Sequence, residues 1–190
     1  IIKPQVLNEF FSFFREIKMQ HTTLNYVFND FKKKQTLVFS NSLGTDLTMW
    51  DKQIELLGQE FNILRYDSRG HGKSEVTQGE YSIEMLGNDV LDLLDYLKIE
   101  KVNFCGLSIG GLTGQWLGIH AAERLNKLIL CNTAVKIGNN KGWNRRIEAV
   151  QNSGLKSIVS ATQERWFTAE YVTANKVEID LVLSKFVRTP

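Results

Sequence analysis

The sequence lacks several features that would place it in other classes of protein. No apolar stretch approaches the roughly 20 residues that a membrane-spanning helix needs, so no membrane partner is expected. A net charge of +2 is too small to favour nucleic acid as a partner. No side chains have the spacing of metal ligands, and no glycine-rich loop carries the lysine of a phosphate-binding loop. We therefore expect neither a metal nor an organic cofactor.

Cysteine is also scarce, with two residues, Cys105 and Cys131. Both lie in apolar runs that predict buried strands. The pair therefore indicates free thiols in a reducing compartment and does not suggest a disulfide framework, which favours a cytoplasmic protein. The composition, with 43% hydrophobic and 23% charged residues, suits a globular chain with its own core.

Runs of strand-like residues alternate with segments of helical periodicity up to Asn132. The expected strands are 23–28, 36–40, 61–66, 101–105 and 128–131, and the expected helices are 46–57, 82–97 and 111–120. This alternation predicts an α/β fold with a mostly parallel sheet and helices on both faces. The loops 41–45, 67–74 and 106–110 follow strands, so they should converge at the carboxyl edge of the sheet, where such folds bind ligands.

The alternation of strand-like and helical segments ends after Asn132. Residues 136–190 have helical periodicity and no convincing strand, which predicts a partial helical lid. Residues 19–135 are expected to form the α/β core. Met19 is a plausible natural start, because strand-like sequence begins just after it. Residues 1–18 combine phenylalanines with charged residues, and we interpret them as an N-terminal extension whose status the sequence leaves open.

The most informative motif is Gly106-Leu107-Ser108-Ile109-Gly110, which lies between a strand-like and a helix-like run. A serine between two glycines on a tight strand-to-helix turn is the pattern of a nucleophile elbow. Such a turn forces the serine into a strained backbone conformation, and a Cβ on either glycine would collide with neighbouring backbone. The alternative interpretation is an ordinary glycine-rich turn. We expect Ser108 to be a catalytic nucleophile whose hydroxyl stands over a helix N-terminus.

Three motifs in this order resemble the α/β-hydrolase fold: Asn-Ser-Leu-Gly-Thr-Asp at 41–46, Asp-Ser-Arg-Gly-His-Gly-Lys-Ser at 67–74, and the elbow. More narrowly, 41–46 and the segments 142–147 and 164–168 are similar to the 3-oxoadipate enol-lactone hydrolases. The resemblance covers roughly residues 20–190. It implies a cofactor-free serine hydrolase with a small lactone or ester substrate. The implied reaction opens 3-oxoadipate enol-lactone to 3-oxoadipate in the β-ketoadipate pathway of aromatic catabolism, through an acyl-enzyme.

The resemblance also implies roles for four further residues. The backbone amides of Leu43 and Ile109 should form the oxyanion hole. Trp143 and Arg146 lie three residues apart on one helical face, where the guanidinium could pair with a substrate carboxylate and the indole could cover the flat ring. Alternatively, Trp143 packs the lid onto the core and Arg146 is solvated, and Arg145 is a rival for the carboxylate.

The sequence departs from the family pattern in its histidines. His120 follows Ser108 but lies at the far end of the predicted helix, about 15 Å or more along the axis, so it cannot be the base. His71 lies in a glycine-rich loop that we interpret as a structural turn, and His21 is close to the expected start. We therefore expect the acidic residue and the histidine of the triad beyond Pro190. The sequence would then be a fragment that lacks its last strands and is inactive and poorly soluble by itself.

Two kinds of alternative stay open. Within enzymes of this fold, the chain could be an esterase, a carbon–carbon bond hydrolase or a cofactor-free haloperoxidase. Outside enzymes, it could be a hydrolase-like ligand sensor that signals through its lid, since the fold alone does not decide function. The sequence leaves the oligomeric state open.

Overall fold

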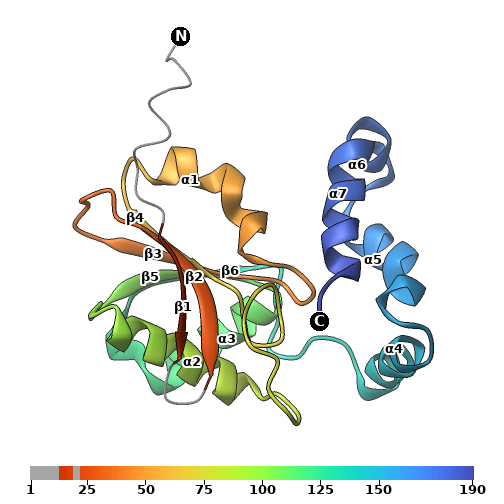
Figure 1. The fold of residues 1–190 in the computed structure, drawn as a ribbon, viewed down its shortest axis with the longest axis horizontal. Helices are drawn as coiled ribbons and strands as arrows, with labels where there is room; N and C mark the ends of the chain where they lie inside the picture. Colours follow the sequence, from red (N-terminus) through yellow and green to blue (C-terminus); the bar gives the residue numbers. More distant parts are fainter. Residues whose placement is uncertain (1–12, 19–21) are drawn as a thin grey trace. The chain divides into compact units, whose positions relative to one another are not determined.

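The computed structural model describes residues 13–18 and 22–190, and Figure 1 presents the fold. The expected start at Met19 and the histidine at position 21 lie outside the described residues. The chain forms two compact units, Ile1–Val135 and Lys136–Pro190. The first unit holds a sheet with its covering helices. The second unit, all of whose residues are described, contains helices and no strand.

A six-stranded sheet runs through the first unit in the order β1-β2-β4-β3-β5-β6. Its strands are β1 (Phe13–Lys18), β2 (Thr23–Asn29), β3 (Thr36–Ser40), β4 (Asn62–Tyr66), β5 (Val102–Leu107) and β6 (Leu125–Cys131). The pairs β3–β4, β3–β5 and β5–β6 are parallel, whereas β2 pairs antiparallel with both β1 and β4. The mostly parallel sheet that the sequence predicts is therefore confirmed.

One strand was missed by the sequence reasoning, which expected ordered strands only after Met19. Strand β1 lies within residues 1–18 and pairs along its whole length with β2, from Phe13 opposite Phe28 onwards. An edge strand in an antiparallel pair does not need a continuous apolar run, because it forms its backbone hydrogen bonds with a single neighbouring strand. The charges within residues 15–18 interrupted the apolar pattern and concealed this strand.

Helices cover both faces of the sheet (Figure 1). Helix α1 (Asp51–Leu57) and the 3-10 helix η2 (Leu47–Trp50) lie on one face, and α2 (Ile83–Tyr96) and α3 (Ile109–His120) lie on the other. A short 3-10 helix, η3 (Ala122–Arg124), leads from α3 into β6. The N-termini of η2 and α2 are capped by Asp46 and Ser82, whose side chains accept backbone N–H bonds, as these residue types do at helix starts.

The two layers of helices bury two separate apolar clusters. The cluster beneath α2 and α3 includes Leu24, Val38, Leu64, Val90, Leu93, Leu94, Phe104 and Leu117. The cluster beneath η2 and α1 holds Leu37, Phe39, Trp50, Ile63 and Cys105. All five residues of β3 are buried, because a central parallel strand is covered on both faces. This rigid centre fixes where the loops at the carboxyl edge of the sheet begin.

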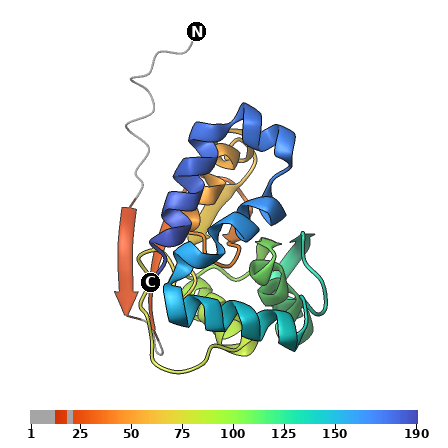
Figure 2. The same cartoon turned by 90° about the vertical axis from the view of Figure 1, so that its right-hand side faces the viewer.

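The second unit is built of α4 (Asn140–Ser153), η4 (Leu155–Ile158), α5 (Val159–Trp166), α6 (Ala169–Ala174) and α7 (Lys176–Val187), as Figure 2 shows in its cyan to blue ribbon. Its small core gathers on α7, where Ile179, Leu183 and Phe186 are buried. The Trp166 ring meets Phe186 edge-on, with 5.6 Å between ring centroids. The helical character expected for this segment is therefore confirmed.

Candidate active site

Ser108 occupies a tight turn between β5 and α3. Its backbone has φ 55° and ψ −111°, a conformation that residues with a Cβ rarely adopt. The turn depends on the flanking glycines. A Cβ on Gly106 would lie 2.1 Å from the carbonyl oxygen of Gly110, and a Cβ on Gly110 would lie 2.4 Å from the carbonyl oxygen of Ser40. The strand–turn–helix geometry expected of an elbow is present at this serine.

Hydrogen bonds with the last residue of β6 and with the segment after it hold the strained turn in place. The Ser108 amide donates to the Cys131 carbonyl over 3.0 Å, and the Thr133 hydroxyl donates to the Ser108 carbonyl over 2.8 Å. Backbone strain of this kind persists where surrounding bonds over-determine it. The sequence does not predict this role of Thr133, because only the pairing of β5 with β6 brings Thr133 to the elbow. A hydroxyl residue just after a strand end was the one available signal.

The loop that follows β3 lies beside the elbow. Ser40, the last residue of β3, pairs with Gly106, and the Gly110 amide donates to the Asn41 carbonyl over 3.1 Å. Within the loop, the Thr45 amide bonds back to the Ser42 carbonyl over 3.2 Å, which forms a turn centred on Leu43 and Gly44. The fold therefore brings the loop that carries Leu43 against the first turn of α3.

The amides of Leu43 and Ile109 are the expected oxyanion donors. Ile109 is the first residue of α3, where a backbone N–H has no acceptor within the helix. Across residues 22–190, neither amide donates a hydrogen bond to another backbone group. The Ile109 amide lies at the positive end of a twelve-residue helix, and both donors suit an anionic oxygen. Their assignment to an oxyanion hole stays a prediction.

The 67–74 loop is a structural turn built on a buried carboxylate. Asp67 Oδ1 accepts from the Leu47 amide at 2.6 Å, and its Oδ2 accepts from Asn25 Nδ2 at 2.7 Å and from the Lys73 amide at 2.9 Å. Burial raises the pKa of Asp67, and the hydrogen bonds from Lys73 and Asn25 oppose that rise. The carboxylate thereby ties this loop to β2 and to the start of η2.

Arg69 in the same loop forms a buried ion pair. Its Nε lies 2.6 Å from Asp89 Oδ2, its terminal nitrogen bonds to the other carboxylate oxygen, and both side chains are almost fully buried. The Asp89 hydrogen bond is the main cause that raises the pKa of Arg69. This fork-like pair anchors the loop on α2. The interpretation of the 67–74 loop as structural agrees with these contacts.

The described histidines do not reach Ser108 by a hydrogen bond. His71 Nδ1 lies 3.1 Å from the Arg69 carbonyl oxygen. His120 is the last residue of α3, and its ring is tilted against the Trp116 ring, with 4.7 Å between ring centroids. In residues 22–190, no histidine forms a hydrogen bond with the Ser108 hydroxyl. The sequence predicts the same outcome on two grounds: His120 lies at the far end of the helix, and His71 belongs to a loop interpreted as a structural turn.

Trp143 and Arg146 meet on α4 within the helical unit. The indole Nε1 donates to the Ile137 carbonyl over 2.7 Å, and the Arg146 guanidinium carbon lies 4.5 Å above the ring. Burial, followed by the nearby positive charge of Arg165, lowers the pKa of Arg146. Arg145 is exposed. The stacked pair is therefore a partly buried cationic site, whereas its neighbour is a solvated charge.

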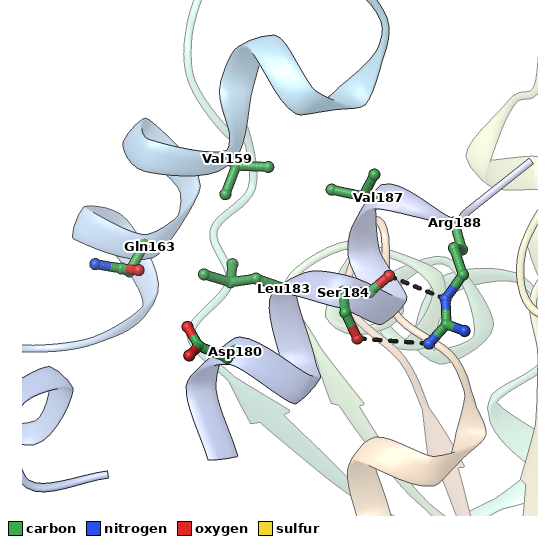
Figure 3. Close-up of a pocket in the computed structure, with 7 residues that line it drawn as sticks. All are labelled: Val159, Gln163, Asp180, Leu183, Ser184, Val187 and Arg188. Carbon is green, nitrogen blue, oxygen red and sulfur yellow. Dashed lines mark hydrogen bonds between the residues drawn. The ribbon is translucent and has the colours of Figure 1, made fainter. Parts of the chain in front are cut away.

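A hollow of about 640 Å³ lies between α5 and α7 of the helical unit (Figure 3). It is lined by Val159, Gln163, Asp180, Leu183, Ser184, Val187 and Arg188. Arg188 Nε donates to the Ser184 carbonyl oxygen over 3.1 Å, so this guanidinium is already engaged within α7. None of the residues predicted for the active site lines this hollow.

The two cysteines are neighbours on β5 and β6, with 3.9 Å between their sulfur atoms. Both are free thiols, of which Cys105 is buried and Cys131 half-buried. Burial raises the pKa of Cys105 to about 12. No group of three or more metal-ligating side chains occurs among the residues that the structure describes. None of the helices in this described part of the chain is both long and apolar enough to span a membrane.

Comparisons with known proteins agree with this architecture. The family model for the alpha/beta hydrolase fold matches residues 35–153. Two curated proteins of Acinetobacter baylyi, 3-oxoadipate enol-lactonase 2 and 3-oxoadipate enol-lactonase 1, are 44% and 42% identical over 85% and 90% of this chain. The chain spans 61% and 64% of the length of these relatives.

Solved structures give the same result. The enol-lactonase from Burkholderia xenovorans is 42% identical with a TM-score of 0.89, over 92% of this chain and 68% of that chain. A hydrolase from Pseudomonas aeruginosa is 35% identical with a TM-score of 0.86, over 96% of this chain and 69% of that chain. The resemblance predicted from the motifs is confirmed. The chain belongs to the α/β-hydrolase fold family, in which it is similar to the 3-oxoadipate enol-lactonases.

Proposed function

We propose that this protein opens the ring of 3-oxoadipate enol-lactone by nucleophilic attack of Ser108. The observation that carries the proposal is the strained backbone of this serine, with φ 55°, at the end of β5 and the start of α3. A hydroxyl presented in this way is the arrangement used for acyl transfer. The likeness to enol-lactonases over most of the chain supports the choice of a lactone as the acyl substrate.

The first chemical step forms a bond between Ser108 Oγ and the lactone carbonyl carbon. Negative charge develops on the carbonyl oxygen, where the amides of Leu43 and Ile109 donate hydrogen bonds. These backbone donors are held by the loop after β3 and by α3, so they need no reorganisation as the charge appears. The partial positive charge at the α3 N-terminus adds to this stabilisation.

Collapse of the tetrahedral intermediate breaks the bond to the ring oxygen, which leaves as an enol and takes up a proton. The acyl group remains on Ser108 until a water molecule hydrolyses the ester. The enol relaxes to a ketone, which draws the reaction towards hydrolysis. A general base must accept the Ser108 proton and later activate the water. Among residues 22–190 no histidine is bonded to Ser108, so the proposal assigns this role to none of them.

The helical unit, residues 136–190, is proposed to act as a lid that recognises the substrate. The lactone carries a carboxylate, and the Arg146 guanidinium is a suitable partner because it is partly buried and lies over the Trp143 ring. The positive charge of Arg165 adds to the local potential that attracts an anion. The indole of Trp143 would then cover the flat lactone ring.

The test uses the protein expressed from the complete reading frame that contains this sequence. Loss of the enol-lactone is followed by ultraviolet absorbance, with 4-nitrophenyl acetate as a neutral ester for comparison. We expect Ser108→Ala to abolish hydrolysis, whereas Ser153→Ala, at an exposed position on α4, should match the wild type. Lactone hydrolysis that survives Ser108→Ala would contradict the proposal. Hydrolysis of the neutral ester without the lactone would indicate an esterase instead.

A further inference from the structure

Asn41 is buried next to the elbow and joins three elements of the first unit. It follows the last residue of β3 and exposes only 1% of its surface. Its Nδ2 donates to the Tyr66 carbonyl oxygen over 2.8 Å, and its Oδ1 accepts from Trp50 Nε1 over 2.9 Å. Its own backbone carbonyl accepts from the Gly110 amide over 3.1 Å. One residue therefore links the end of β4, the end of η2 and the first turn of α3.

The backbone bond of Asn41 connects the two proposed oxyanion donors. Asn41 lies two residues before Leu43, and Gly110 directly follows Ile109. The bond from Gly110 to Asn41 therefore bridges the two donors by a short path through the backbone. A shift of Asn41 would move the Leu43 amide relative to the Ile109 amide. The side chain of Asn41 opposes such a shift, because both of its polar ends have fixed partners.

We infer that Asn41 is a positioning residue, whose carboxamide sets the spacing of the Leu43 and Ile109 amides around the developing oxyanion. This inference rests on the proposed function, because the oxyanion hole belongs to that mechanism. Asn41 does not touch the reacting atoms in this mechanism. It acts through the loop that carries Leu43, and its effect is on the rate of the chemical step.

The two partners of the side chain explain why an amide is suited to this position. The Tyr66 carbonyl can only accept a hydrogen bond, and Trp50 Nε1 can only donate one. The side chain between them must therefore offer one donor and one acceptor. A carboxylate offers acceptors alone, whereas a protonated carboxylic acid offers both. Trp50 is itself held in place, since its ring stacks on Phe39 with 4.4 Å between centroids.

The variants Asn41→Leu and Asn41→Asp, made in the protein from the complete reading frame, distinguish the loss of both side-chain hydrogen bonds from the loss of the donor alone. Asn41→Leu removes both bonds without adding charge, and kcat for the lactone should fall by about 10- to 100-fold at every pH, with KM within about threefold. Asn41→Asp should lose about as much near pH 8.5. Its activity relative to the wild type should recover towards pH 5.5, because protonation of the introduced carboxyl restores the donor to the Tyr66 carbonyl.

Two titratable groups near this position, Tyr66 and Asp67, are already present in the wild type. The Tyr66 hydroxyl is bonded to Ser40 Oγ at 2.7 Å, and burial raises its pKa far above this range. The neighbouring Asp67 carboxylate is held by donors from Leu47, Asn25 and Lys73. Both groups are common to the wild type and the variants, so the ratio of the two activities at each pH isolates the introduced carboxyl.

Asn103→Leu is the matched control. Asn103 is also buried, at 4% exposure, and donates to Gln35 Oε1 over 2.9 Å at the amino end of β5, away from Ser108. We expect it to lower stability as Asn41→Leu does while kcat stays within about twofold of the wild type. Trp50→Phe keeps the aromatic ring but removes its donor, and we expect an intermediate loss of kcat. Combined with Asn41→Leu, it should add little, because both changes break the same bond.

The outcomes separate this inference from the proposed function. A wild-type kcat for Asn41→Leu, or a loss no greater than that of Asn103→Leu, would overturn the positioning role. A constant ratio between Asn41→Asp and wild type from about pH 5.5 to 8.5 would overturn the role of the two carboxamide bonds. Absence of any Ser108-dependent hydrolysis in the wild type would instead refute the proposed function, a result that no Asn41 variant can produce.

Discussion

Replacing Gly106 with alanine tests whether the close approach of the Gly106 backbone to Gly110 and Gly111 is needed for the reactivity of Ser108. An added Cβ would lie 2.1 Å from the Gly110 carbonyl oxygen, 2.4 Å from its carbonyl carbon and 2.6 Å from the Gly111 nitrogen. All three are backbone atoms of α3, so no side chain can rotate away from the clash. Since ordinary van der Waals contact begins near 3.4 Å, α3 and β5 would have to separate by roughly 1 Å.

Such a separation would affect both stability and the proposed chemistry. We expect the free energy of unfolding to fall by about 2–4 kcal/mol, because an overpacked backbone contact cannot relax by changing rotamers. The Ile109 amide would move with α3, away from its place beside Ser108. A displacement of about 1 Å in a catalytic arrangement costs about 100-fold in rate, and kcat for the lactone should fall by that order while KM changes less.

Urea unfolding and steady-state hydrolysis of the protein from the complete reading frame measure the two effects. Gly118→Ala is the control, because Gly118 lies in the same helix α3 and its added Cβ would meet only the Leu128 side chain, at 3.3 Å. We expect this control to keep its stability within about 1 kcal/mol and its kcat unchanged. Equal behaviour of Gly106→Ala and Gly118→Ala would refute the reasoning.

Three other predictions concern separate parts of the chain. Arg146→Ala should raise KM for the anionic lactone about 10-fold or more and leave KM for 4-nitrophenyl acetate unchanged, and Arg145→Ala, at an exposed position, is the control. Equal changes in KM for both substrates would contradict carboxylate recognition. Asp67→Asn should lower the free energy of unfolding, measured in urea, by about 1–3 kcal/mol, because an amide nitrogen cannot accept the hydrogen bonds that Oδ2 accepts. An unchanged unfolding midpoint would show that this carboxylate does not stabilise the loop. Ile129→Lys should weaken concentration-dependent self-association of the 190-residue chain in sedimentation, because β6 is the last strand of the described sheet and Ile129 is 44% exposed. Unchanged association of this variant would show that another surface is responsible.

Much of the central sheet was predictable, because its signals are local. The apolar run in 36–40 became β3, and Asp46 and Ser82 capped the helices expected after them. The elbow was equally accessible, since two glycines around a serine at a strand end report a backbone constraint directly. Strand β1 was missed for the opposite reason. Its evidence is the pairing with β2, and residue pairing leaves no mark in the periodicity of one short charged segment.

The surroundings of the candidate site were less predictable. The sequence marked the backbone of the loop after β3 but not the side chain of Asn41, whose partners Tyr66 and Trp50 come from other elements. Thr133 likewise reaches the Ser108 carbonyl only because β6 lies beside β5. Hydrogen bonds between residues that are far apart in sequence depend on topology, and a single sequence does not record them.

The sequence by itself determined the α/β class of the chain, the helical character of residues 136–190 and the position of the elbow serine. These features follow from hydrophobic periodicity, capping residues and glycine placement, which act over a few neighbouring residues. Tertiary structure alone decided which partners hold Ser108, Asn41 and Asp67. Buried polar groups must find hydrogen bonds wherever the packed sheet brings donors and acceptors together, and that meeting is fixed by the whole fold.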